Sequence, residues 1–486
     1  MSDFNDIIVD MHCHPALKPF GQHHALGIPD SIQQDILELP PPLATQRNSI
    51  WHYDNPTFWD KFKNALPGNL IHFSQSDFTS IAAGNVRVVT VALYPLERGF
   101  VDSNFGTGKL TEFVVNLTTM VGKPRIKRLQ EMEDYFSDLE KEYAFYRWWD
   151  GKEVDTHKGT FKYCLSKNYA HLMDIISKDE HAIGVVFSIE GGNVLNTGMG
   201  KPIHREEVLQ NVDKIKAWSH KPLYMTYAHH FYNNLCGHAE SMNGISNKLV
   251  DQSEGLNEGI TPLGFEVLDR LLDKEKHRIL IDIKHMSVKS RQQYLQYLKE
   301  NYQYDPVPLI VSHGAATGTK SYYEQTMSTE MSSHLYDMDI NFFDDEILEI
   351  TRSGGLFCLQ IDERRIASKA ALKQASGKIG RKKVLFHRAK LVWNNIQHVA
   401  EVLDRADFYP WGTVALGSDY DGIVNPLNGY WTAEDLKELD TYLLMHAYDY
   451  MEGKGKYLSN GSHTDPEEIV SRFLSDNAMA FLEKHY

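Results

Sequence analysis

Short apolar runs rich in Val, Ile and Leu recur along the chain between longer segments with helical periodicity. Such runs are typical of parallel strands that are buried on both faces. In the intervening segments, of which 261–277 and 344–354 are the clearest, apolar residues recur at spacings of three and four, as on the buried side of a helix. The pattern predicts eight strands, at residues 7–11, 86–94, 183–189, 223–228, 279–283, 309–312, 355–361 and 413–418.

Eightfold alternation of strand and helix favours a closed α/β barrel over an open sheet. We therefore expect a single (β/α)8 TIM-type barrel domain across residues 1–486, with large insertions after the first and second strands, at about 15–83 and 100–180. The first insertion is rich in Pro, His and aromatic residues and is expected to fold over the barrel mouth. The second is expected to contain a helix pair. The basic, small-residue-rich segment 368–383 is expected to be a mobile surface loop.

Charge and composition narrow the function classes. The chain has 50 Lys and Arg residues against 65 Asp and Glu residues, a formal net charge of −15, which argues against a nucleic-acid partner. The N-terminal stretch does not resemble a signal peptide, and there is no apolar run long enough to span a bilayer. We expect a cytoplasmic protein without a membrane partner. The four cysteines lie far apart, which indicates reduced thiols.

Side chains suited to metal binding or acid–base chemistry follow six of the predicted strands. In a TIM-type barrel, the residues that carry chemistry stand at the carboxyl ends of the strands. Taken singly, each of these side chains is weak evidence, because a lone His at a strand end is more often structural. Together they predict a site that core packing does not explain. The candidates are His12, His14, Glu190, His229 or His230, His285, His313 and Asp419.

The ligand types indicate the chemistry. Imidazole and carboxylate donors without thiolate favour zinc, and manganese, cobalt or iron would also suit them. A bridging carboxylate, for which Glu190 is the candidate, can hold two divalent ions that share a nucleophilic hydroxide. Asp419 would orient this metal-bridging hydroxide and carry its proton to the leaving amine. His229 would donate to the developing oxyanion, with His230 as the competing choice.

The motifs, in this order, resemble those of the membrane (renal) dipeptidase family, peptidase family M19 of the amidohydrolase superfamily. They include FSIEGGNVL, YMTYAHHFYNN, RILIDIKHMS, PLIVSHGAA and ALGSDYDG. The resemblance implies a binuclear zinc peptidase that cleaves dipeptides, and it implies a homodimer. It also implies metal ligation by His12, Glu190, His285 and His313, substrate polarisation by His229, and an acid–base role for Asp419.

Two departures from the family pattern bear on substrate choice. The family motif His-x-Asp here ends in His14, which leaves the site with more positive charge. Where the family places an Arg for the substrate carboxylate, after SHGAA, the nearest cation is Lys320, and Arg364 and Arg365 are the other candidates for that contact. For this Arg pair, a solvated charge at the strand end is the favoured interpretation.

Other functions therefore stay open. They are an amidohydrolase acting on a non-dipeptide amide, lactam or cyclic imide, a non-catalytic metal-binding barrel and, as a minor alternative, a metal-dependent isomerase or decarboxylase.

Overall fold

The computed structural model describes residues 7–24, 41–60, 73–101, 121–242, 250–423 and 425–486. Parts of both predicted insertions, residues 25–40, 61–72 and 102–120, lie outside the described residues.

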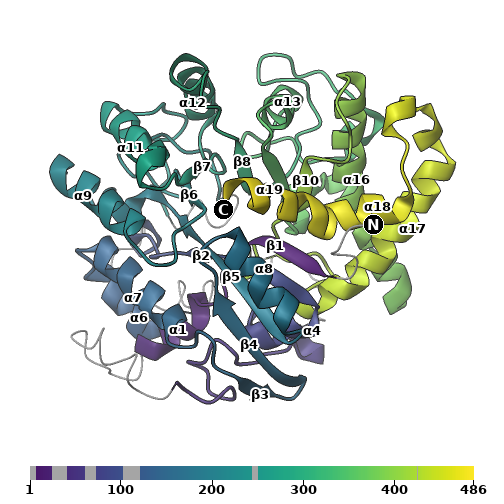
Figure 1. Ribbon diagram of the computed structural model, residues 1–486. Coiled ribbons are helices and arrows are strands. Elements are labelled where there is room, and N and C mark those ends of the chain that lie inside the picture. Colours follow the sequence, from purple (N-terminus) through teal and green to yellow (C-terminus); the bar gives the residue numbers. More distant parts are fainter. Residues whose placement is uncertain (1–6, 25–40, 61–72, 102–120, 243–249, 424) are drawn as a thin grey trace.

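Eight parallel strands form a nearly closed barrel, as the sequence predicted (Figure 1). Each strand pairs in parallel with its neighbours in the order β1-β2-β5-β6-β7-β8-β9-β10. All residues of β1 and β5 are buried, in keeping with their continuous apolar runs. The strands are β1 (Ile8–Cys13), β2 (Val86–Leu93), β5 (Ala182–Glu190), β6 (Tyr224–Thr226), β7 (Leu280–Asp282), β8 (Ile310–Gly314), β9 (Leu356–Leu359) and β10 (Val414–Leu416).

The barrel closes between the first strand and the segment after the last one. The His14 amide donates to the Tyr420 carbonyl, and the Asp419 amide donates to the His12 carbonyl, each at 2.9 Å. Below them, the Asp10 carboxylate accepts from the Ser418 amide at 2.8 Å. Residues about 400 positions apart are thus joined where the predicted chemistry lies.

Amphipathic helices surround the strands and bury their apolar sides against them (Figure 1). Thr261 caps α11 by accepting from the Gly264 amide at 2.9 Å, and Ser287 caps α12 in the same way. At the amino end of β10, Asn477 of α19 donates to the Val414 carbonyl at 2.8 Å. The surrounding helices are α9 (Arg205–Lys216), α11 (Pro262–Leu272), α12 (Val288–Asn301), α13 (Asp344–Arg352), α14 (Glu363–Ile366), α16 (Arg381–Arg405), α17 (Leu436–Glu452), α18 (Pro466–Ser471) and α19 (Asn477–His485).

The insertions contain more structure than the sequence indicated. The described parts of the first hold α1 (Leu17–His24) and α4 (Phe78–Ala83). Helices are present at the predicted place in the second, but a hairpin of β3 and β4 was not predicted, and β4 adds to the lower half of β5. The elements of this second region are α6 (Lys123–Gln130), α7 (Tyr135–Arg147), β3 (Val154–Thr156), β4 (Gly159–Leu165) and α8 (Tyr169–Lys178).

The prediction of a surface loop at 368–383 was wrong. Residues Lys369–Ala375 form α15, and α16 already begins at Arg381. Ser368 caps α15 by accepting from the Ala371 amide at 3.2 Å, and Ala371 and Ala375 are buried against the core. The small apolar residues that suggested a loop are the packing face of this short helix.

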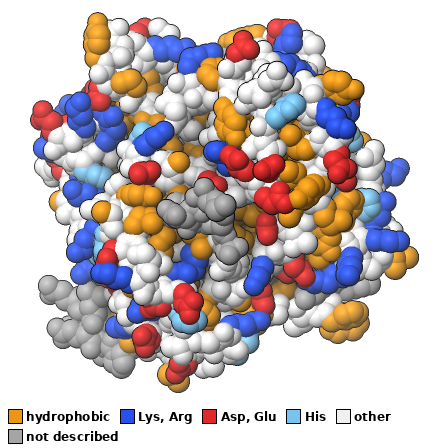
Figure 2. Space-filling view, turned by 45° about the vertical axis from the view of Figure 1, so that its right-hand side comes forward, with side chains coloured by type: hydrophobic (Ala, Val, Ile, Leu, Met, Phe, Trp, Pro, Cys, Tyr) orange, Lys and Arg blue, Asp and Glu red, His pale blue; other side chains and the backbone are white. Residues whose placement is uncertain are grey.

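The surface agrees with the mixed composition. On the face shown in Figure 2, acidic and basic side chains are interspersed. None of the described helices combines the length and the apolar character needed to cross a membrane. All four cysteines are free thiols, as expected.

Candidate metal centre

Glu190 lies at the centre of the predicted side chains. It is the last residue of β5, and its carboxylate is buried among imidazoles that come from the ends of β1, β7 and β8. The oxygen Oε2 lies 3.1 Å from Nε2 of His14. The distances from Oε1 to the Nε2 atoms of the other histidines are 3.4 Å for His12, 3.6 Å for His313 and 3.9 Å for His285.

The backbone at the strand ends is bent to present these groups. Gly191 turns the chain away after Glu190 with φ of 96°, which favours glycine. His285 and Asp419 have φ of 65° and 59°, in the left-handed region that non-glycine residues rarely occupy. Strain of this kind concentrates at functional sites, because the surrounding structure must hold it in place.

Hydrogen bonds behind two of the histidines fix which ring nitrogen faces Glu190. The Tyr224 hydroxyl donates to the Met11 carbonyl at 2.7 Å and so accepts from Nδ1 of His12, which lies 3.0 Å away. The Ser312 hydroxyl donates to Asp282 at 2.6 Å and so accepts from Nδ1 of His313. Both rings therefore present the Nε2 lone pair inward, which is the arrangement of a metal ligand.

Charges in the cluster favour a cation. Burial raises the pKa of Glu190, but the charges on His229 and His14 outweigh it and hold that pKa well below its ordinary value. For His14, burial is outweighed by Glu190 and Asp419, which raise its pKa to about 10. Burial holds the pKa values of His285 and His313 well below the usual range, so both rings are neutral. The Glu190 carboxylate with the neutral rings of His285 and His313 is a suitable metal ligand set, and an ion bound at His14 would displace the proton of that ring.

The residues fit two ions that share Glu190. One group of ligand atoms comes from His12, His14 and Glu190, and another from Glu190, His285 and His313; the atoms of each group lie within 4.8 Å of one another. Glu190 Oε1 is buried without a hydrogen-bond partner among the described residues, as expected of an oxygen that binds a metal.

Asp419 lies beside both groups. Its Oδ1 is 3.6 Å from Nε2 of His14, and its Oδ2 is 3.9 Å from Nε2 of His313.

His229 is oriented by a carboxylate that sequence reasoning missed. Its Nδ1 lies 2.7 Å from Oε2 of the buried Glu97, and its Nε2 lies 3.6 Å from Oε1 of Glu190. Burial lowers the pKa of His229, but Glu190 and Glu97 outweigh it, so the net shift is upward and favours the imidazolium. The only signal for Glu97 in the sequence is its place just after the second strand.

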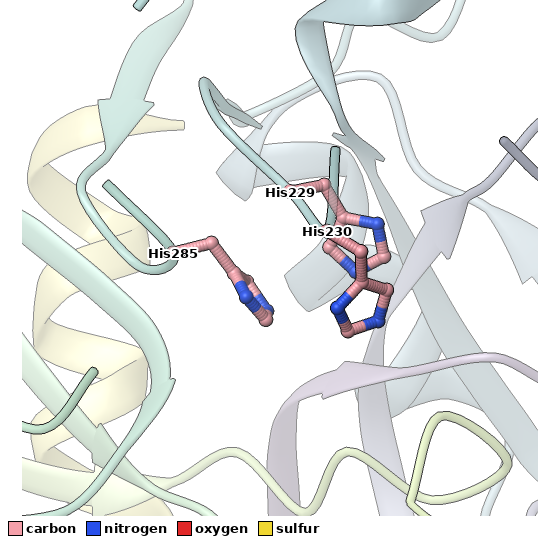
Figure 3. Close-up of side chains that lie close together, drawn as sticks. All are labelled: His229, His230 and His285. Atoms are coloured by element: carbon pink, nitrogen blue, oxygen red, sulfur yellow. The ribbon is translucent and has the colours of Figure 1, made fainter. Parts of the chain in front are cut away.

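His230 lies beside His229, and both face His285 (Figure 3). The rings of His229 and His230 are 3.8 Å apart, and Nδ1 of His230 lies 2.7 Å from the Ser241 hydroxyl. Because His229 approaches Glu190 and His230 is held by Ser241, the geometry favours His229 as the residue that meets the substrate carbonyl.

The three candidate cations lie in different surroundings. Arg365 is half-buried, donates to the Ser241 carbonyl, and acts electrostatically on Lys284 and His230. The Arg364 side chain is half exposed and pairs with Asp362 at 3.5 Å. Lys320 is exposed and pairs with Glu324. The geometry therefore favours Arg365 for a substrate carboxylate.

Lys284 is a further buried group near the site that sequence reasoning did not single out. It directly precedes His285, and the residue is only 1% exposed. Burial, and next the charge of Arg365, lower its pKa to about 7.

Comparisons with known proteins place the chain in a family. No curated protein sequence matches it. Among solved structures, it is similar to a crystal structure of the dipeptidase AC, a family M19 metallopeptidase (13% identity, 99% of each chain covered, TM-score 0.49). It is also similar to a metallopeptidase from Rhodobacter sphaeroides liganded with a phosphinate mimic of the dipeptide L-Ala-D-Ala (13% identity, 99% of each chain covered, TM-score 0.49). A third similar structure is that of the probable dipeptidase PvdM from Pseudomonas aeruginosa (12% identity, 94% of this chain and 99% of that chain covered, TM-score 0.48).

The model of one protein family, "Membrane dipeptidase (Peptidase family M19)", matches residues 167–456. This match spans more than half of the chain, and the chain therefore belongs to the membrane dipeptidase family of metal-dependent hydrolases, peptidase family M19.

Proposed function

We propose that the protein hydrolyses dipeptides at a centre of two divalent metal ions bridged by Glu190. The observation that carries this proposal is the position of the Glu190 carboxylate, whose Oε2 lies near His14 and whose Oε1 lies near three further imidazoles, those of His12, His313 and His285. Ions bound there would polarise the scissile carbonyl and lower the pKa of a water molecule. Family membership supports the use of divalent metal.

The remaining side chains supply the steps around the carbonyl. Asp419 would orient the attacking water, take its proton and deliver it to the amine that leaves when the peptide C–N bond breaks. His229, whose pKa is raised by Glu190 and Glu97, would donate a hydrogen bond to the oxygen that becomes negative. Arg365 would bind the substrate's terminal carboxylate, with Arg364 as the less suited neighbour.

Zinc is the metal that we propose for both positions, because nitrogen and oxygen donors without thiolate suit it; manganese, cobalt and iron suit the same donors. The homodimer and the cytoplasmic location expected from the sequence stay predictions.

The proposal is tested by removing and restoring the metal. Protein treated with a chelator should lose hydrolysis of Ala-Ala and regain it with zinc, manganese or cobalt. A lactam and a cyclic imide serve as comparison substrates. Full turnover by the metal-free protein would refute the metal mechanism, and turnover of the lactam or imide alone would refute the dipeptidase assignment.

A further inference from the structure

A second buried carboxylate lies in the same turn as the proposed proton carrier. Asp421 follows Asp419 by two residues, and its side chain is 1% exposed. Both residues have left-handed backbone, with φ of 59° at Asp419 and 67° at Asp421. Residues other than glycine rarely adopt this conformation, so contacts around the turn must hold it in place.

The Asp421 carboxylate supplies such contacts, because both of its oxygens accept hydrogen bonds from other segments. Oδ1 accepts from Nζ of Lys18 at 2.6 Å. Oδ2 accepts from the Ser76 amide at 2.8 Å, from the Ser76 hydroxyl at 2.7 Å and from the Ser74 hydroxyl at 3.3 Å. The Gln75 amide lies 3.1 Å and 3.0 Å from the two oxygens, and the Asp421 amide in turn donates to Oε1 of Gln75 at 2.9 Å.

The donors belong to the first insertion. Lys18 lies in α1, just after the strand that carries His12 and His14, and residues 74–76 lie just before α4. On its other side, the turn is joined to the metal centre, since the Asp419 amide donates to the His12 carbonyl. Asp421 therefore joins the first insertion to the turn that positions Asp419.

We propose that Asp421 is a positioning residue for hydrolysis. It holds the turn after β10 against residues 74–76 of the first insertion, and so keeps the Asp419 carboxylate where it can take a proton from the attacking water. The end of the first insertion thereby contributes to the reaction without contacting the substrate. This inference rests on the proposed dipeptidase function and on the acid–base role of Asp419.

The first test replaces Asp421 with its isosteric amide. Asn also tolerates left-handed backbone, but its NH₂ group must face one of the donors that the two carboxylate oxygens now accept from. In Asp421→Asn, kcat for Ala-Ala should fall by at least about tenfold, because a small displacement of a catalytic group is costly. KM should stay unchanged, and zinc titration should show that the variant still binds the pair of ions.

Two further variants separate positioning from a general loss of stability. Asp138→Asn breaks a comparably buried ion pair with Arg125 in the second insertion, and it should keep the wild-type kcat although it lowers the melting temperature. Lys18→Met should lower kcat in the wild-type background but add little in Asp421→Asn, since both changes act through one carboxylate. A folded, metal-loaded Asp421→Asn with wild-type kcat would overturn the inference.

Hydrogen exchange tests the positioning without reference to turnover. The Gly422 and Ile423 amides donate to the Asp419 carbonyl at 3.0 Å and 2.9 Å. In metal-loaded Asp421→Asn these two amides should exchange at least about tenfold faster, with the amides of β5 unchanged. Exchange equal to that of the wild type would refute the role of Asp421. Absent turnover of Ala-Ala by the wild type, with faster exchange in the variant, would refute the dipeptidase assignment and support the positioning.

Discussion

At the scale of single residues, the site depends on the orientation of its imidazoles. His12 and His313 are each fixed by a hydroxyl that donates elsewhere and so accepts from the ring, Tyr224 in one case and Ser312 in the other. The sequence predicted the imidazole rings but not these hydroxyls. Tyr224 lies on another strand from His12, and the Ser312 hydroxyl accepts from His313 only because it donates to the distant Asp282.

Tyr224→Phe should weaken metal binding. Without the hydroxyl that accepts from Nδ1, His12 is no longer held with Nε2 inward, and the affinity for the ion at His12 and His14 should fall by about 10- to 100-fold. The control is Tyr294→Phe, since Tyr294 is buried with no hydrogen-bond partner for its hydroxyl among the described residues. Competition with a chromogenic chelator measures both variants, and equal affinities would show that Tyr224 does not orient the ligand.

Asp419→Asn should keep the metal and lose turnover. The amide has nearly the same shape and also tolerates the left-handed backbone, but it cannot accept a proton, so kcat should fall by about 10²- to 10⁴-fold. Asp407→Asn, an exposed position with φ of 61°, is the control for the backbone. An unchanged kcat in metal-loaded Asp419→Asn would exclude Asp419 as the proton carrier.

At the scale of elements, the strands were predictable, whereas the insertions were predictable only in the helices of the second one. Apolar runs such as that of β5, separated from one another by helical segments, are typical of buried parallel strands. The hairpin β3–β4 is polar and partly exposed, so its sequence lacks the apolar signal of a strand. The contact between Glu97 and His229 joins residues 132 positions apart, and no local pattern could reveal it.

The loop after β10 is the element where packing bears most directly on chemistry. A Cβ atom added at Gly422 would lie 2.1 Å from Oδ1 of Asp419 and 2.9 Å from the His14 ring. Gly422→Ala should therefore displace both groups and lower kcat/KM by at least about tenfold, since small misplacements of catalytic groups are costly. The control is Gly461→Ala, because a Cβ atom added at Gly461 would have no other heavy atom within 4 Å. Wild-type kinetics for Gly422→Ala would mean that the loop adjusts without moving Asp419.

At the scale of the whole molecule, the site forms only when the barrel closes. Hydrogen bonds between the two ends of the barrel, from Asp419 to His12 and from Ser418 to Asp10, lie directly at the metal ligands. The ions would therefore bind the closed fold and not the unfolded chain, so metal loading should raise the melting temperature.

Metal binding should strengthen as the pH rises. His14 has a pKa of about 10 in the metal-free protein, above its ordinary value, so at neutral pH an ion must displace its proton. The same shift stabilises the metal-free fold fully below about pH 6.5, and this contribution is lost as the pH rises through about 10.

Chelator competition at about pH 6.5 and 8.5 measures the apparent affinity for the ion bound at His14. The loss of the His14 proton alone should raise this affinity by about tenfold per pH unit. His14→Asn is the comparison, since it has no such proton to displace. Identical slopes in the two proteins would contradict a protonated His14.

The central claim is that two ions bridged by Glu190 carry out dipeptide hydrolysis. The most direct measurement is a titration of the metal-free protein with zinc in which Ala-Ala turnover is followed against ions bound per chain. We predict that turnover reaches its maximum at two ions per chain and that Glu190→Gln neither binds the pair tightly nor turns over. Full activity at one ion per chain, or wild-type activity in Glu190→Gln, would contradict the account.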